Sequence, residues 1–222
     1  MTKTIDYFFS IGSPWAFIGV EPFAALAKQQ GATIRPHLIP LIEENGGIYS
    51  KNRPEARRAY WITDLKRWAA LRGKVLNFDN RAALSDPSPA GLMVAAAIEK
   101  GEDWLKLAVA LQEAFWVRRE DIGKADIRQA IATAAGFDAV ALDEHGKSDA
   151  VAVLQKASFE AARAAGVFGV PTYRYQDELY WAGQPSVPRA SSQGRKTGRL
   201  MFTARWRRRS GVASRARRPQ GL

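Results

Sequence analysis

The chain has 222 residues, enough for one large domain or two small ones with an apolar core. It contains no cysteine, which excludes disulfides, thiolate metal sites and dithiol chemistry carried by the protein itself, and we predict no metal site. The N-terminus lacks the pattern of a secretion signal, and no apolar run reaches the roughly 18 residues of a membrane helix. We therefore expect a soluble, cytoplasmic protein without membrane contact.

The net charge of +11 comes from one end of the chain. Eleven of the 33 Lys and Arg residues, and none of the 22 Asp and Glu residues, lie between residues 185 and 222. Residues 1–184 are therefore neutral overall, and nucleic-acid binding is not expected except through the basic tail.

The first predicted unit is a strand, a helix and a second strand. Residues 4–9 are aromatic and β-branched and predict a buried strand, and residues 33–39 predict the next one. Between them, Ser13 is placed as the N-cap of a helix, Pro14 as its first residue and Gly31 as its C-terminal cap. His37, a lone histidine in the second strand, is interpreted as structural.

The start of this helix is a candidate anion site. Its first backbone N–H groups have no partner within the helix, and the helix dipole adds positive potential there. Such a position suits a thiolate. By itself a Ser-Pro pair is more often only a helix cap, and both interpretations stay open on these residues alone.

Helical periodicity dominates the middle of the chain, after a loop at 41–53. We predict helices over residues 55–71, 90–100, 103–117, 126–135, 139–144 and 148–165, whose aromatic residues we assign to the core. Residues 166–173 then predict a strand, and a turn at Gln176 and Asp177 leads to another at 178–181. The strands flank the helices and must therefore pair across them.

Three segments carry a resemblance to a known family. They are Tyr7–Trp15 (YFFSIGSPW), Asp64–Ala69 (DLKRWA) and Val167–Thr172 (VFGVPT), with weaker matches at Asn52-Arg53 and Trp116–Ile122. In this order they resemble the 2-hydroxychromene-2-carboxylate isomerases and kappa-class glutathione transferases, in the DsbA-like branch of the thioredoxin superfamily. The resemblance implies an α/β, thioredoxin-like fold at 1–40 and 166–184, with a large, all-helical insertion domain at 41–165.

The resemblance also implies a sulfur site built on glutathione. Where disulfide oxidoreductases of this fold carry Cys-x-x-Cys, this chain has Ser13-Pro14-Trp15-Ala16. Ser13 would then be the catalytic residue, and its hydroxyl would favour the thiolate form of glutathione. The Val170–Pro171 bond would be cis, so that the backbone of Val170 pairs with the glutathione peptide as a strand would.

The activity implied is glutathione-dependent cis–trans isomerisation of an aromatic hydroxy-pyruvate or 2-hydroxychromene-2-carboxylate. A slot for this aromatic carboxylate is predicted from Trp15, Phe17, Tyr60 and Trp61, with Asn52, Arg53 and Arg57 as polar and charged contacts. On the residues alone, a solvated loop and helix face explains these last three equally well. A kappa-like transferase or peroxidase, and a non-catalytic binding protein, remain as alternatives, and a homodimer is expected.

The chain departs from the family pattern after Gln184. The family continues with Gly-x-Asp-Arg, whose Asp contacts the glutamyl amine of glutathione, and a final helix. Here residues 185–222 are rich in Arg, Ser, Gly, Ala and Pro, and no acidic residue follows Glu178. We hypothesise a shift of the reading frame near Gln184; the alternative is an authentic disordered arm that binds nucleic acid.

Overall fold

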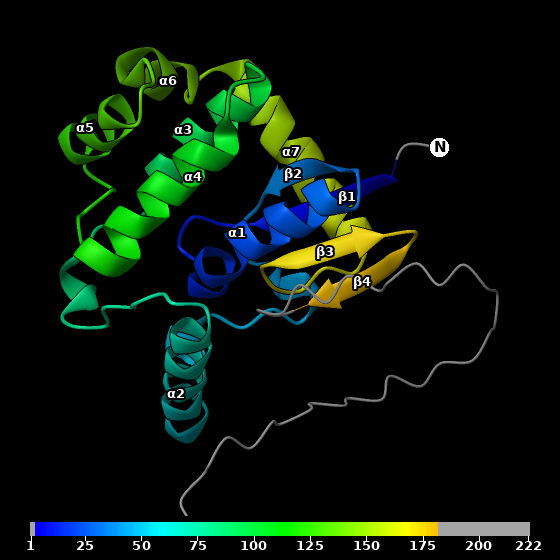
Figure 1. Ribbon diagram of the computed structural model, residues 1–222, viewed down its shortest axis with the longest axis vertical. Helices are drawn as coiled ribbons and strands as arrows, with labels where there is room; N and C mark the ends of the chain where they lie inside the picture. The colour runs from blue at the N-terminus through cyan, green and yellow to red at the C-terminus, as the bar shows by residue number, and fades with distance from the viewer. Residues whose placement is uncertain (1–2, 182–222) are drawn as a thin grey trace, which may run out of the picture. The chain divides into compact units, whose positions relative to one another are not determined.

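Four strands from the two ends of the described chain, residues 3–181, form one mixed sheet in the order β2-β1-β3-β4 (Figure 1). They are β1 (Lys3–Phe9), β2 (Ala32–Leu38), β3 (Thr172–Tyr175) and β4 (Glu178–Trp181). The central strand β1 runs parallel to β2 and antiparallel to β3, and β3 and β4 form a hairpin. Pairing of strands across the helical segment is thus confirmed. The hypotheses on residues 185–222 lie outside the described residues.

Seven α-helices and four shorter turns connect these strands in the described part of the chain. The helices are α1 (Pro14–Gln29), α2 (Glu55–Leu71), α3 (Ser88–Glu99), α4 (Trp104–Glu113), α5 (Ala125–Ala134), α6 (Ala139–His145) and α7 (Asp149–Ala164). The short turns are η1 (Glu43–Asn45), η2 (Ser50–Asn52), η3 (Arg81–Ala83) and the π-helical η4 (Ala114–Arg118). No described helix is long and apolar enough to cross a membrane.

One predicted strand was too long at its start. Residues 166–171 are irregular, and β3 begins only at Thr172. Gly166 adopts a left-handed conformation with φ +75°, and Pro171 has no N–H to give to a strand ladder. The apolar run Gly166–Pro171 is therefore a loop, buried at Val167, Gly169 and Pro171 and exposed at Phe168.

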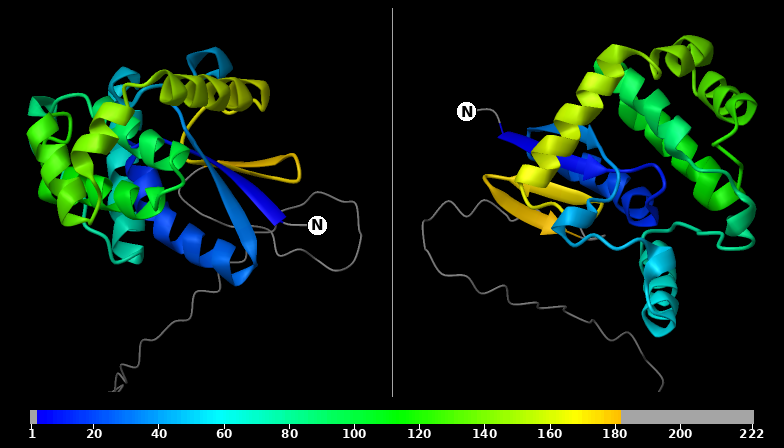
Figure 2. Two further views of the ribbon diagram at one scale, coloured as in Figure 1. Left: turned by 90° about the horizontal axis from the view of Figure 1, so that it is seen from above. Right: turned by 180° about the vertical axis from the view of Figure 1, so that it is seen from behind.

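The strand β1 is buried on both faces, as its run of five buried residues Ile5–Phe9 shows. Tyr7 and Phe9 face α1 and join the main core, whereas Phe8 packs with Ala162 of α7. Figure 2 shows α1 and α7 on opposite sides of the sheet. The helix α7 belongs to the segment predicted as the insertion, yet it covers the sheet and contacts β2.

The remaining helices form two groups. Helix α3 contacts α4, α6 and α7, and α5 packs between α4 and α6. Helix α2 stands apart from this group in Figures 1 and 2 and packs on α1 instead. That contact is built from Ile18, Leu65 and Ala69, with Trp61 and Trp68 beside them. The predicted helix over 55–71 is confirmed at both ends.

A charged cluster lies on the α7 face of the sheet. The buried Asp6 carboxylate accepts hydrogen bonds from Arg35, from His37 Nε2 at 2.9 Å and from Arg174 Nε at 3.1 Å. Burial alone would raise the pKa of Asp6, but the bonds from Arg35 and His37 outweigh it and lower that pKa to about 2. Burial lowers the pKa of His37 despite the carboxylate beside it. His37 also contacts Ser158 of α7, at 3.3 Å, so the cluster joins the helix to the sheet.

Candidate functional site

The first turn of α1 is arranged as its sequence predicts. Ser13 is the N-cap in an extended conformation (φ −84°, ψ 117°), and Pro14 follows as the first helical residue. The Ser13 side-chain oxygen accepts a hydrogen bond from the Ala16 N–H at 3.2 Å. This bond satisfies one of the free donors at the helix start and fixes the position of the oxygen.

The Ser13 hydroxyl is also a donor. It gives its hydrogen bond to the main-chain carbonyl of Val170 at 3.2 Å, which brings together two of the three predicted cofactor contacts, Ser13, Val170 and Pro171. The Val170–Pro171 peptide bond is cis, as the resemblance implies. Thr172 donates from its hydroxyl to the Gly169 carbonyl at 2.6 Å and ties this loop to the start of β3.

Positive potential concentrates beside the Ser13 oxygen. Among residues 3–181, the Trp15 N–H has no hydrogen-bond acceptor, and it points along the dipole of a 16-residue helix. An anion placed at this point would receive a donor that the folded protein leaves unused. The arrangement can therefore stabilise a thiolate or an oxyanion.

Ser13 opens into a cavity of about 1030 Å³, large enough for a peptide-sized and a small aromatic molecule together. The described residues that line it come from the start of α1, the loop 38–53, α2, the start of α3, α7 and the loop before β3. Aromatic side chains are frequent in this lining; they are Trp15, Tyr49, Tyr60, Trp61, Trp68 and Trp181.

The cations of the cavity come from the loop 38–53 and from α2. Lys51, Arg53 and Arg57 line it, and the Arg53 guanidinium lies 5.5 Å from the centre of the Trp61 ring. Burial and, second, the charge of Arg57 lower the pKa of Arg53. An anionic ligand would relieve the repulsion between the two guanidinium groups, so this wall is suited to carboxylates.

Two acidic residues also line the cavity. Asp86 is occupied, because it accepts hydrogen bonds from the Ser88 N–H at 3.0 Å and the Ser88 hydroxyl at 2.8 Å. Asp64, half-buried on α2, makes no hydrogen bond or ion pair within residues 3–181. It is therefore available to a cationic group of a ligand.

Most of the predicted site residues meet in this cavity. Ser13, Trp15, Arg53, Arg57 and Val170 line it, together with Tyr60 and Trp61 of the predicted aromatic slot. Asn52 and Pro171 are absent from the lining, although each is next in sequence to a residue that belongs to it.

The prediction for Phe17 was wrong. Its side chain is 1% exposed and packs in the main core, with the Lys74 ammonium 4.9 Å from the centre of its ring. Phe17 lies about one helical turn after Ser13. At this point α1 already packs against the sheet, and Phe17 joins the core that Tyr7 and Phe9 form there.

Several other lining residues have no clear signal in the sequence. Tyr49 and Lys51 lie in a loop without periodicity, Gln155 is one of many polar residues on α7, and Trp181 ends the last hairpin. They reach the cavity only through the tertiary arrangement. Asp64 and Trp68 did stand in a motif, but nothing in that motif indicated which of its side chains face a ligand.

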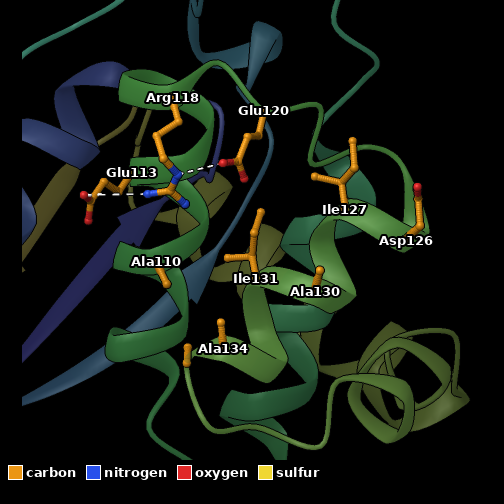
Figure 3. A pocket seen from close by; sticks show the side chains of 10 residues that line it. Ala110, Glu113, Arg118, Glu120, Asp126, Ile127, Ala130, Ile131 and Ala134 are labelled. Atoms are coloured by element: carbon orange, nitrogen blue, oxygen red, sulfur yellow. Dashed lines mark hydrogen bonds and ion pairs between the residues drawn. The ribbon is translucent and has the colours of Figure 1, made fainter.

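A second hollow lies between α4, η4 and α5, far in sequence from the predicted site residues (Figure 3). Its floor consists of small and aliphatic residues such as Ala110, Ala130 and Ile131. At one end Arg118 pairs with Glu120 at 2.7 Å and with Glu113 at 3.7 Å, as Figure 3 shows. One guanidinium thus pairs with two carboxylates, Asp126 adds a third acidic group to the lining, and no predicted site residue lines this hollow.

Comparison with known proteins agrees with the fold described above. Residues 4–193 match the model of the DSBA-like thioredoxin domain. The chain belongs to the DSBA-like thioredoxin family. The predicted fold class, a thioredoxin-like α/β fold with inserted helices, is thereby confirmed.

Within this family, the chain is 30% identical over 186 residues to a 2-hydroxychromene-2-carboxylate isomerase of Sphingobium xenophagum, covering 82% of this chain and 93% of the relative. The predicted resemblance to these isomerases is therefore confirmed at the level of family.

Solved structures of the DSBA-like fold include a 2-hydroxychromene-2-carboxylate isomerase with a TM-score of 0.65 and 23% identity, covering 81% of this chain and 89% of that one. The cytosolic disulfide reductase DsbM from Pseudomonas aeruginosa, solved with GSH, gives a TM-score of 0.60 at 20% identity, covering 82% and 93%. At these identities the similarity concerns the fold.

Proposed function

We propose that this protein is a glutathione-dependent cis–trans isomerase of aromatic hydroxy-pyruvates of the 2-hydroxychromene-2-carboxylate type. The observation that carries the proposal is the Ser13 hydroxyl, which caps α1, contacts the Val170 carbonyl and opens into an aromatic, cationic cavity. The names of the relative from Sphingobium xenophagum and of the solved isomerase support the reaction type. DsbM, of the same fold, was solved with GSH, which supports the cofactor.

The residues present fit glutathione. Its thiol, two carboxylates and one ammonium group match the types of partner in the cavity. The Ser13 hydroxyl and the Trp15 N–H suit the sulfur, and three cationic side chains suit the carboxylates. Asp64, which has no partner within residues 3–181, suits the ammonium group. Bound glutathione would supply a thiolate that adds reversibly to a conjugated double bond and so permits rotation about it.

Ser13 has one proton to donate, and this limits what it can do at any moment. In this structure the proton is given to the Val170 carbonyl at 3.2 Å. A peptide N–H that pairs with the Val170 carbonyl, as a neighbouring strand would, competes with the Ser13 hydroxyl for this acceptor. Ser13 is then free to turn its proton toward a neighbouring sulfur while its oxygen keeps the bond from Ala16.

The rest of the cavity would orient the substrate. Trp61 and Tyr60 offer ring faces to an aromatic group, and Arg53 and Arg57 offer charge to its carboxylate. Homodimerisation is part of the proposal.

Titration with glutathione tests the proposal, with the thiolate followed by its ultraviolet absorbance. We expect thiolate at neutral pH with the wild-type chain and its loss in Ser13→Ala. Ser88→Ala, which alters another serine of the same cavity, is the matched control and should behave as wild type. A folded wild-type protein that leaves the thiol pKa near its ordinary value of about 8.5 would overturn the sulfur site.

A kappa-like glutathione transferase or peroxidase would share the same sulfur site. Two assays on the wild-type chain distinguish the reactions: isomerisation of 2-hydroxychromene-2-carboxylate and conjugation of chlorodinitrobenzene. Turnover of the first substrate without consumption of glutathione supports the isomerase. Conjugation alone supports the transferase and rejects the isomerase.

A further inference from the structure

Gln112 on α4 is a buried polar residue that the proposed chemistry does not use. Its side chain is 1% exposed, and its neighbours in sequence Ala108, Leu111 and Phe115 belong to the main core. An amide in such surroundings is costly unless its hydrogen bonds are made. An apolar residue of similar size would fill the space without that cost. The presence of an amide here therefore indicates that its hydrogen bonds have a role.

Both bonds of the amide nitrogen go to the turn that precedes Ser13. Gln112 Nε2 donates to the Ser10 carbonyl at 3.3 Å and to the Ile11 carbonyl at 3.5 Å. The donor and its acceptors are about a hundred positions apart in the chain. The helical segment thus holds the turn that delivers the candidate catalytic serine.

The Ser10 carbonyl has a second partner that links it to Ser13 directly. It accepts the Ser13 N–H at 3.2 Å, the bond that closes the turn. One oxygen therefore receives the backbone of Ser13 from one side and the side chain of Gln112 from the other. Movement of this carbonyl would move Ser13 with it.

The turn Ser10–Gly12 is also closely packed against its neighbours. Ile11 is 2% exposed, and a methyl group added to Gly12 would lie 3.2 Å from Pro87 Cγ. Within residues 3–181, the side-chain hydrogen bonds to the Ser10 and Ile11 carbonyls come from Gln112. The packing leaves little room for the turn, and the amide sets the direction of its carbonyls.

We propose that Gln112 is a positioning residue that orients Ser13 for the sulfur site. The inference rests on the proposed function, because the quantity it controls is the stabilisation of a thiolate by the Ser13 hydroxyl. A hydrogen bond to an anion depends steeply on distance and angle, so a small displacement of Ser13 weakens it. Gln112 acts through the turn and makes no contact with the sulfur.

The test compares two glutamine variants of matched chemistry. Gln112→Met removes the donors and keeps the volume. Gln129→Met makes the same change on α5, where Gln129 Nε2 donates to Asp143 at 3.0 Å, outside the cavity. For each variant we would measure the thermal midpoint, the pKa of bound glutathione by thiolate absorbance, and the exchange rate of the Ser13 amide proton.

In Gln112→Met we expect the pKa of the bound thiol to rise by about half to one unit, a threefold to tenfold loss of thiolate at a fixed pH below that pKa. Exchange of the Ser13 amide should become faster. Gln129→Met should lower the thermal midpoint while both of these site readouts stay at their wild-type values. A merely structural role for Gln112 would change the midpoint alone.

The outcomes separate this inference from the function on which it rests. If the wild-type chain forms no thiolate, the sulfur site and the positioning role fall together. If the wild type forms thiolate and Gln112→Met keeps the same pKa, only the positioning role is overturned. Should Gln112→Met fail to fold, Gln112→Asn, which keeps an amide but shortens its reach, replaces it. Failure of both to fold beside a folded Gln129→Met would assign Gln112 to stability instead.

Discussion

The hydroxyl of Ser13 donates a hydrogen bond to the main-chain carbonyl of Val170, 157 positions further along the chain. The same oxygen accepts the Ala16 N–H. One serine therefore caps a helix and joins the two halves of the sheet region at the edge of the cavity. A substitution of Ser13 can therefore change both the stability of the helix cap and the contact at the cavity.

Replacement of Ser13 by two different residues separates these roles. Ser13→Asp keeps an acceptor for the Ala16 N–H and should retain the stability of the helix cap, whereas Ser13→Ala should lose about 1 kcal/mol of unfolding free energy. Both should lose the thiolate of bound glutathione, since neither has a hydroxyl proton and Asp adds a negative charge. Thermal unfolding and thiolate absorbance measure the two effects. Retained thiolate in Ser13→Asp would contradict the assignment.

Arg57 is expected to bind an anionic group of substrate or glutathione. Arg57→Gln should raise the KM of one of them by about threefold to tenfold and make that KM less sensitive to salt, because one charge-assisted contact is lost. Arg58→Gln removes the same charge from the next residue of α2, which does not line the cavity, and is the matched control. Equal effects of the two variants would reduce the role of Arg57 to that of general surface charge.

Asp6 makes the stability of the fold depend on acid pH. Its pKa lies at about 2 in the folded protein, below the ordinary value of 3.8. The resulting stabilisation is therefore complete above about pH 4 and disappears as the pH falls toward 2, and we expect about 1–2 kcal/mol after screening near the exposed Arg35. Asp6→Asn should be less stable at pH 7 and should flatten this dependence. Chemical denaturation at several pH values measures it; an unchanged slope in Asp6→Asn would point to other carboxylates.

Two adjacent glycines within the loop 38–53 should respond differently to alanine. A methyl group on Gly47 would overlap the Phe168 carbonyl and lie 2.6 Å from the Ile42 carbonyl, so backbone must move. Gly46 has open space and only a positive φ of 88°. We expect Gly46→Ala to cost about 1 kcal/mol and Gly47→Ala about 2–3 kcal/mol, with weaker binding at the neighbouring Tyr49. Denaturation and glutathione titration check both; similar costs would show that the loop yields easily.

The features that the sequence predicted well depend on local chemistry. The N-cap at Ser13, the helix at Glu55–Leu71 and the turn at Gln176 and Asp177 follow from capping, periodicity and turn preferences, and the structure has all three. The family motifs also located Ser13 and Val170 at one site before any contact between them was known.

The features that were missed depend on tertiary direction. Phe17 has the right composition for an aromatic slot, but the sheet packs against its side of α1 and buries it. Trp181 and Gln155 reach the cavity because the last hairpin ends beside it and the middle of α7 passes it, which no local pattern encodes. Gln112 resembled any polar residue of an amphipathic helix until its bonds to Ser10 and Ile11 were seen.

Because Ser13 and Val170 are 157 positions apart in the chain, they are also synthesised at different times. At a synthesis rate of about 5–20 residues per second, the Val170 carbonyl leaves the ribosome about 8–30 s after Ser13. During this interval the nascent chain presents β1 without its partner β3 and a capped helix without the acceptor of its serine proton. Premature termination within the helical segment would therefore release a product that keeps Ser13 but lacks Val170 and the cis-proline loop that faces it.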